Sequence, residues 1–136
     1  MGDQIFFRYV RTLEPSPGDI IEILRTGGYS HFVVYVGGGY VVHVSGNGKK
    51  GSGSKIKKEL LDEVAGLDLC RINNRETAAT LKELTPYSRD AIVRRAEAAI
   101  GDSWSYNFLT RNCEHFATRD QFYKNIYTNV TKNRLI

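Results

Sequence analysis

The feature that constrains the fold most is a pair of short runs rich in β-branched and aromatic residues, at 31–36 and 40–45, separated by the glycines 37–39. Glycine adopts the positive φ angles of tight turns without a steric penalty, whereas valine and aromatic residues favour extended strands. This pattern predicts a β-hairpin whose loop consists of the three glycines.

Side-chain alternation along this predicted hairpin brings two histidines to one face. With a three-residue loop, Val33 lies opposite His43, and residues two apart on a strand share a face. His31 and His43 are then diagonal neighbours, about 7–8 Å apart at the backbone and within side-chain reach of a common centre. A two-residue loop would shift the register by one residue and place the histidines on opposite faces. The register therefore decides whether the hairpin carries a site.

Glycine is concentrated in the first half of the chain, where twelve of the thirteen glycines lie at or before Gly66. Together with the β-branched runs, this distribution predicts strands first and helices second. Strands are expected at 19–25 and 67–72, while the sequence GNGKKGSGS at 46–54 predicts a flexible loop. The segment 55–64 fits a helix or a strand, and the closely following strand favours the strand.

Two helices are expected in the second half. An apolar stripe at helical spacing predicts a helix over 88–100, which Ser88 can cap and Gly101 can end. The stripe consists of Ile92, Val93, Ala96, Ala99 and Ile100. A second helix is expected to begin at Asn112 and to run past Phe122. With 136 residues, the chain is long enough for one domain and short of two.

Composition excludes several classes of protein. A net charge of +4 and a pI near 9.1 are too mildly basic to indicate a nucleic-acid partner. No apolar run approaches the ~18 residues of a membrane-spanning helix. The start of the chain, 1–11, is not a secretory signal. Cys70 and Cys113 are therefore interpreted as free thiols of a protein in the reducing cytoplasm.

Cys113 is the candidate nucleophile, although a lone cysteine is more often a buried packing residue. Asn112 is a preferred N-cap and places Cys113 in a first helical turn, where free backbone N–H groups and the helix dipole favour the thiolate. Glu114 opposes this effect slightly. Cys70 is assigned to the core, and His115 projects roughly 200° away around the helix, so a structural role is expected for it.

Nucleophilic catalysis needs a proton acceptor beside the thiol, together with donors for an oxyanion. A strand histidine is more often structural than catalytic, but His31 and His43 share the predicted face. The same two histidines could bind zinc together with Cys113. No fourth ligand is evident, however, and the twelve-residue histidine separation is not a zinc-finger spacing, so no metal is expected. The glycines 37–39 precede a strand rather than a helix and do not indicate a phosphate site.

Four motifs between about 15 and 116 resemble the lecithin:retinol acyltransferase-like proteins, and most closely the HRAS-like suppressor enzymes, which are phospholipase A/acyltransferases. The motifs are PGDIIEILR (17–25), YSHFVVYVGGGYVVHVS (29–45), KKELLDEVAG (57–66) and RNCEHF (111–116). The resemblance implies an α+β fold of the circularly permuted papain-like (NlpC/P60) type over 1–136, with an antiparallel sheet packed against helices.

The resemblance also implies roles for individual residues. Cys113 becomes the nucleophile, His31 the general base, and His43 the second histidine, which orients and polarises the first. Asn112 and Tyr29 line the site, and Tyr29 either helps to hold the oxyanion or is an aromatic flanking a turn. The implied reaction is attack on a glycerophospholipid acyl ester, giving a thioester that water, an amine or a hydroxyl resolves without a cofactor.

One departure keeps other interpretations open. The cellular acyltransferases of this type end in a hydrophobic membrane anchor, whereas the chain after Phe116 is polar. We expect either a truncated part of a cytoplasmic protein that associates with the membrane through a C-terminal anchor absent from this chain, or a soluble relative. The alternatives are a non-catalytic interaction protein of the picornaviral 2A H-box/NC type and a cysteine peptidase or amidase.

A cluster of lysines surrounds the predicted loop at 46–54 and is either a solvated loop or a patch that docks on anionic lipid. Such a patch contributes about 1 kcal/mol per basic residue near a charged membrane. The lysines are Lys49, Lys50, Lys55, Lys57 and Lys58.

Overall fold

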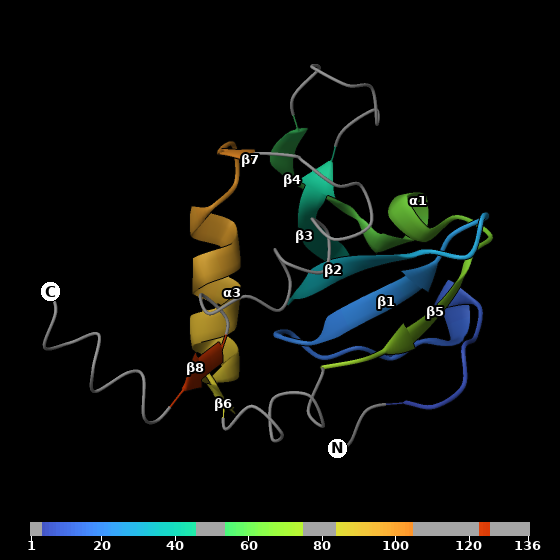
Figure 1. The fold of residues 1–136 in the computed structure, drawn as a ribbon, viewed down its shortest axis with the longest axis horizontal. Helices are drawn as coiled ribbons and strands as arrows, with labels where there is room; N and C mark the ends of the chain where they lie inside the picture. Colours follow the sequence, from blue (N-terminus) through green and yellow to red (C-terminus); the bar gives the residue numbers. More distant parts are fainter. Residues whose placement is uncertain (1–3, 46–53, 75–83, 105–122, 126–136) are drawn as a thin grey trace, which may run out of the picture.

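The structure is a computed structural model that describes residues 4–45, 54–74, 84–104 and 123–125 (Figure 1). The elements in these ranges are η1 (Val10–Thr12), β1 (Ile20–Leu24), β2 (Ser30–Gly37), β3 (Tyr40–Ser45), β4 (Ser54–Leu60), α1 (Leu61–Ala65), β5 (Leu69–Ile72), β6 (Leu84–Pro86), α3 (Arg89–Ala98), β7 (Ser103–Trp104) and β8 (Tyr123–Asn125). The expected strands at 19–25 and 67–72 and the helix at 88–100 are confirmed. The predicted loop, except for Ser54, and the predicted helix from Asn112 up to residue 122 lie outside the described residues. The expected continuation of that helix past Phe122 was wrong, because Tyr123–Asn125 form strand β8.

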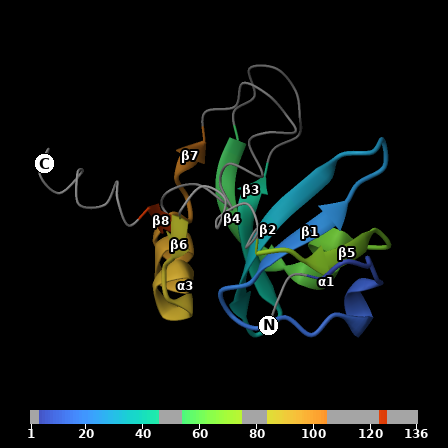
Figure 2. The same cartoon turned by 60° about the horizontal axis from the view of Figure 1, so that its bottom comes forward.

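An antiparallel sheet with the strand order β5-β1-β2-β3-β4-β7 forms the centre of the described structure. Helix α3 lies against one face of this sheet and α1 against the other, as Figure 2 shows most clearly. β6 and β8 form a separate antiparallel pair. The α+β class and the antiparallel sheet are therefore confirmed.

Each sheet face carries its own apolar cluster because neighbouring strand residues point to opposite sides. The face covered by α3, here called the α3 face, carries Ile20, Phe32, Val34, Val42, Val44 and Ile56 against Ile92 and Ala96 of the helix. The face covered by α1, the α1 face, carries Ile21, Ile23, Val33, Val41 and Cys70 against Leu61, Val64 and Ala65. Leu13 joins this second cluster.

The β2–β3 hairpin keeps the predicted register but not the predicted loop. Strand β2 continues through Gly37, which pairs with Tyr40, so the turn itself has only two residues. A β-bulge between Tyr35 and Gly37 absorbs one residue and restores the pairing of Tyr35 with Val41. The three-glycine loop was thus wrong. The bulge replaces the third loop residue and keeps each side chain on its predicted face.

The segment 55–64 changes from strand to helix at its middle. Its first half alternates as a strand, whereas Leu61, Val64 and Ala65 are buried at the i, i+3, i+4 spacing of a helix. The backbone N–H of Leu61 donates to the carbonyl of Gly39 at 2.8 Å and fixes the change of direction. The preference for a strand was therefore correct only up to Leu60.

Helix α3 begins and packs as its sequence predicts. The Ser88 side chain accepts a hydrogen bond from the N–H of Ala91 at 3.2 Å, which confirms the cap. Ile92 and Ala96 are buried against the sheet. Ile100 is 39% exposed because the helix ends at Ala98, so its place in the apolar stripe was wrong.

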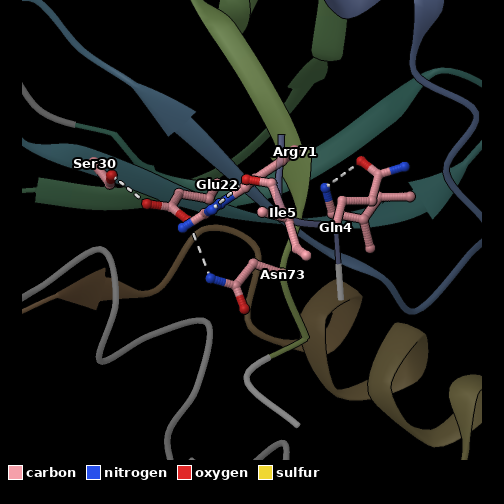
Figure 3. Close-up of polar contacts among 7 residues, drawn as sticks. Gln4, Ile5, Glu22, Ser30, Arg71 and Asn73 are labelled. Carbon is pink, nitrogen blue, oxygen red and sulfur yellow. Dashed lines mark hydrogen bonds and ion pairs between the residues drawn. The ribbon is translucent and has the colours of Figure 1, made fainter. Parts of the chain in front are cut away.

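A buried carboxylate on β1 connects the strands on either side of it, β2 and β5 (Figure 3). Glu22 accepts hydrogen bonds from Ser30 Oγ at 2.6 Å, Arg71 Nε at 2.8 Å and Asn73 Nδ2 at 3.0 Å. Burial raises the pKa of Glu22, but the three hydrogen bonds and the Arg71 charge outweigh burial and leave the pKa below its usual value. Ser30 shares a face with Phe32, so the residue between them points to the α1 face.

Replacing Glu22 with glutamine is expected to lower the free energy of unfolding by about 2 kcal/mol at neutral pH, because Arg71 loses its charged partner. Since folding lowers the pKa of this carboxyl, its contribution is complete above the unfolded value and is lost as pH falls through the folded pKa. Urea unfolding at neutral and at acidic pH measures the difference. A deficit that persists after the wild-type carboxyl is protonated would contradict this account, and Glu14→Gln at an exposed site is the control.

Candidate functional site

Two buried histidines meet on the α1 face. His31 of β2 is 7% exposed and His43 of β3 is 5% exposed. His31 Nε2 lies 2.8 Å from His43 Nδ1, with the ring centroids 5.1 Å apart and the rings at 75°. This contact follows from the predicted register, which puts both side chains on one face. The pair shares one hydrogen between two facing nitrogens, so one imidazole donates and the other accepts.

The surroundings keep both imidazoles neutral. Burial, the nearby His43 and then the Arg25 charge lower the pKa of His31 to about 3. Burial also lowers the pKa of His43, although the charge and hydrogen bond of Glu59 oppose the effect. A neutral imidazole has a lone pair, so this pair can accept a proton at neutral pH.

Glu59 is a site residue that sequence reasoning missed. It lies on β4 opposite Val41, and its Oε2 is 3.3 Å from Nε2 of His43. Its side chain is 38% exposed, so the carboxylate stands between the buried imidazoles and water. The sequence could have indicated it only through the β3–β4 register, which the ambiguous segment 55–64 left undetermined.

Arg25, directly after β1, supplies the positive charge that acts on both histidines. Its Nη1 donates to the carbonyl of Val64 at 2.8 Å and to Oδ2 of Asp68 at 2.9 Å. These bonds connect the end of β1 to α1 and to the segment that follows it. Arg25 therefore stays near the site as a bound cation and disfavours a second positive charge on the imidazoles.

Tyr29 lies at the turn that leads into β2. Its carbonyl accepts a hydrogen bond from the Arg25 N–H at 2.8 Å. Its ring lies beside the turn, 3.9 Å from the place that a Cβ on Gly27 would occupy. This position agrees with an aromatic residue that flanks the turn, and the oxyanion role of Tyr29 stays a prediction.

The predicted nucleophile Cys113 and its neighbour Asn112 lie outside the described residues, as do Glu114 and His115. The other cysteine, Cys70, lies within the described residues. Cys70 is completely buried in the α1-face cluster, and burial raises its pKa to about 11. Its burial confirms the assignment to the core. A thiol with such a pKa is not ionised at neutral pH.

The predicted lysine cluster divides between two faces. Lys55 and Lys57 are exposed and lie opposite Ser45 and His43, on the α1 face. Lys58 lies on the α3 face, where its Nζ forms a 2.8 Å ion pair with Glu97. Lys58 and Lys57 lie on opposite faces because consecutive strand residues alternate, and the role of these lysines at a membrane stays a prediction. Lys49 and Lys50 lie outside the described residues.

Within 4–45, 54–74, 84–104 and 123–125, no group of three histidine, cysteine, aspartate or glutamate side chains is placed to hold a metal ion. Over the same ranges, no helix has both the length and the apolar character needed to cross a membrane.

Comparison with known proteins finds one matching family model and several relatives that carry the same kind of name. The model of the lecithin retinol acyltransferase family matches residues 13–124. Phospholipase A and acyltransferase 3 of Mus musculus is 39% identical over 115 residues, which cover 76% of this chain and 68% of that protein. Phospholipase A and acyltransferase 4 of Homo sapiens is 34% identical over 134 residues, or 90% of this chain and 79% of that protein. Human phospholipase A and acyltransferase 2 is 40% identical over 114 residues, or 75% and 67%.

Proposed function

Because this chain belongs to the lecithin retinol acyltransferase family, we propose that it is a phospholipase A and acyltransferase that cleaves glycerophospholipid acyl esters with the thiol of Cys113. The observation that carries the proposal is the buried, neutral and hydrogen-bonded pair of His31 and His43. A neutral imidazole has the lone pair with which a general base takes a proton from a nucleophile and later returns it.

In the first half-reaction, His31 takes the proton of the Cys113 thiol while the sulfur bonds to the ester carbonyl carbon. The carbon–oxygen bond of the ester then breaks, and the leaving glycerol oxygen receives the proton from His31. The products are a lysophospholipid and an acyl thioester on Cys113. His43 orients His31 through their shared hydrogen bond and stabilises the transient imidazolium.

In the second half-reaction, water attacks the thioester carbon and gives its proton to His31. The carbon–sulfur bond breaks, sulfur regains the proton, and a fatty acid leaves. When an amine or a hydroxyl attacks instead, the acyl group is transferred. The same side chains, Cys113 and His31, perform both half-reactions. The proposal therefore includes neither a metal nor an organic cofactor.

We place this chemistry in a single catalytic domain over 1–136, with the circularly permuted papain-like arrangement of the NlpC/P60 type. Asn112 caps the helix that presents Cys113. Tyr29 lines the site. The order of elements in the described part supports this arrangement, because the histidine strands precede the segment that contains the thiol.

A basic rim is the second part of the proposal. Lys55 and Lys57 are exposed on the same sheet face as the histidines, and Lys49 and Lys50 are close to them in the sequence. We propose that these four lysines attract the anionic surface of a phospholipid membrane, at about 1 kcal/mol per basic residue. The ester bonds of the substrate lie just below that surface.

The proposal predicts that the protein releases free fatty acid and lysophosphatidylcholine in equal amounts from phosphatidylcholine vesicles. Adding a primary amine should divert acyl groups to the amide at the expense of free fatty acid. Mass spectrometry of the lipid extract measures all three products. Cleavage of a peptide amide without turnover of phospholipid would instead support a peptidase or amidase. Turnover of neither substrate would support the non-catalytic interaction protein.

A further inference from the structure

Three side chains from neighbouring strands form a line across the α1 face. His31 comes from β2, His43 from β3 and Glu59 from β4, and these strands are adjacent in the sheet. His31 Nε2 lies 2.8 Å from His43 Nδ1, and His43 Nε2 lies 3.3 Å from Glu59 Oε2. Both ring nitrogens of His43 are thus engaged, one by an imidazole and the other by a carboxylate.

The carboxylate determines which ring nitrogen donates and which accepts in each of these hydrogen bonds. An ionised carboxylate only accepts hydrogen bonds, so its contact with His43 requires a hydrogen on Nε2 of that ring. A neutral imidazole carries only one N–H, so Nδ1 of His43 accepts and Nε2 of His31 donates. His31 then holds its lone pair on Nδ1, and that nitrogen is the one able to take a proton.

We propose that Glu59 is a positioning residue that fixes this tautomer of His43 and thereby selects Nδ1 of His31 as the base. Glu59 acts through His43 and does not itself touch the reacting atoms. The inference rests on the proposed acyl-transfer function, which requires His31 to take the thiol proton, and it adds the identity of the nitrogen and of the residue that selects it.

The other charged groups around His43 do not select the same tautomer. Lys57 lies opposite it on β4, and Arg25 lies beyond the end of β1, where Asp68 holds it. Both cations lower the pKa of His43, whereas the Glu59 carboxylate raises it and accepts from its ring. Glu59 is, among the residues that the structure describes, the carboxylate within hydrogen-bond distance of this imidazole.

Without Glu59, the hydrogen bond between the histidines can reverse. His43 then donates from Nδ1 to Nε2 of His31, and His31 carries its own hydrogen on Nδ1. The reversed pair has the same shape and the same neutral charge, but Nδ1 of His31 can no longer accept a proton. The protein would therefore fold normally while a fraction of the molecules is inactive.

The test is Glu59→Ala in the full chain, with phosphatidylcholine as substrate. We expect kcat to fall about tenfold with KM little changed, since the competent tautomer is depleted and the imidazolium loses a counter-charge. Glu59→Gln keeps a carbonyl acceptor and should recover part of the loss. Glu97→Ala is the matched control, because Glu97 has a similar exposure of 41% and an ion pair with Lys58, but lies on the α3 face. It should retain wild-type kcat.

Nitrogen-15 NMR of the histidine rings provides the second readout, which does not depend on activity. Wild-type spectra should show a protonated Nε2 on both rings, and Glu59→Ala should show a mixture of tautomers on His43. A wild-type His43 protonated on Nδ1 would overturn the inference, as would a Glu59→Ala variant with unchanged tautomer and unchanged kcat. An inactive wild type that shows the expected tautomers contradicts the proposed function instead, so the two failures are distinguishable.

Discussion

Replacing Cys113 with alanine is expected to reduce fatty-acid release from phosphatidylcholine by about 10⁴-fold or more, to the uncatalysed rate. The expectation follows because the thiol makes the bond to the acyl carbon, and none of the neighbouring groups in the proposed mechanism can substitute for it. Binding of the variant to vesicles should be preserved, since the substitution leaves the lysines intact. Product release measured against vesicle binding separates the two effects.

The second cysteine provides the control for this substitution. Cys70→Ala removes a buried sulfur from the α1-face cluster and should lower stability, while leaving the phospholipase rate close to that of the wild type. The thiol of Cys70 has a pKa of about 11 and stays protonated at neutral pH, so alkylation should modify Cys113 first. Equal loss of activity in both variants would point to destabilisation rather than to a nucleophile.

Replacing His31 with glutamine is expected to lower kcat/KM by about 10³-fold, because the proton acceptor for the thiol is lost. Glutamine is suited to this test, since its amide N–H can still donate to His43 and preserve the hydrogen bond that His31 makes. The substitution should therefore change chemistry more than folding. Initial rates on phosphatidylcholine vesicles, with thermal unfolding on the same samples, measure the two contributions.

His43→Gln should cost less than His31→Gln, because His43 acts on the base and not on the substrate. The rate of Cys113 alkylation gives an independent readout. It should fall in His31→Gln because the proton acceptor for the thiol is lost, and it should fall less in His43→Gln. A His31→Gln variant that alkylates and hydrolyses lipid as fast as the wild type would contradict the assignment of His31 as the base.

The histidine pair could be predicted from sequence because strand alternation is a strong local rule. Only the sheet face on which His31 and His43 each lie had to be predicted correctly. The structure places both histidines on the predicted face, but it does so with a two-residue turn and a bulge after Tyr35. The sequence contains three adjacent glycines that tolerate either solution, so the position of the turn within them depends on pairing with the rest of the sheet.

The partners of the histidines could not be predicted in the same way. Glu59 and Arg25 reach the site through the β3–β4 pairing and the end of β1, which are long-range arrangements. The segment 55–64 also has mixed periodicity, with a strand before Leu61 and a helix after it. Local propensity cannot locate such a change, because it is fixed here by a backbone hydrogen bond from Leu61 to Gly39.

Burial of Glu22 illustrates a related limit. A glutamate between isoleucines in a predicted strand is expected to face water, and nothing local identifies Ser30, Arg71 and Asn73 as its partners. These residues come from two other parts of the chain and become neighbours only in the folded sheet. Buried charges of this kind are determined by tertiary structure.

The central claim is that an acyl group from a phospholipid is carried by one sulfur. The most direct measurement is mass spectrometry of the protein after brief exposure to phosphatidylcholine and an acid quench. The account predicts an acyl adduct on the peptide containing Cys113, removable by hydroxylamine and absent from Cys113→Ala. Release of fatty acid with the acyl group trapped on another residue, or with no dependence on Cys113, would contradict it.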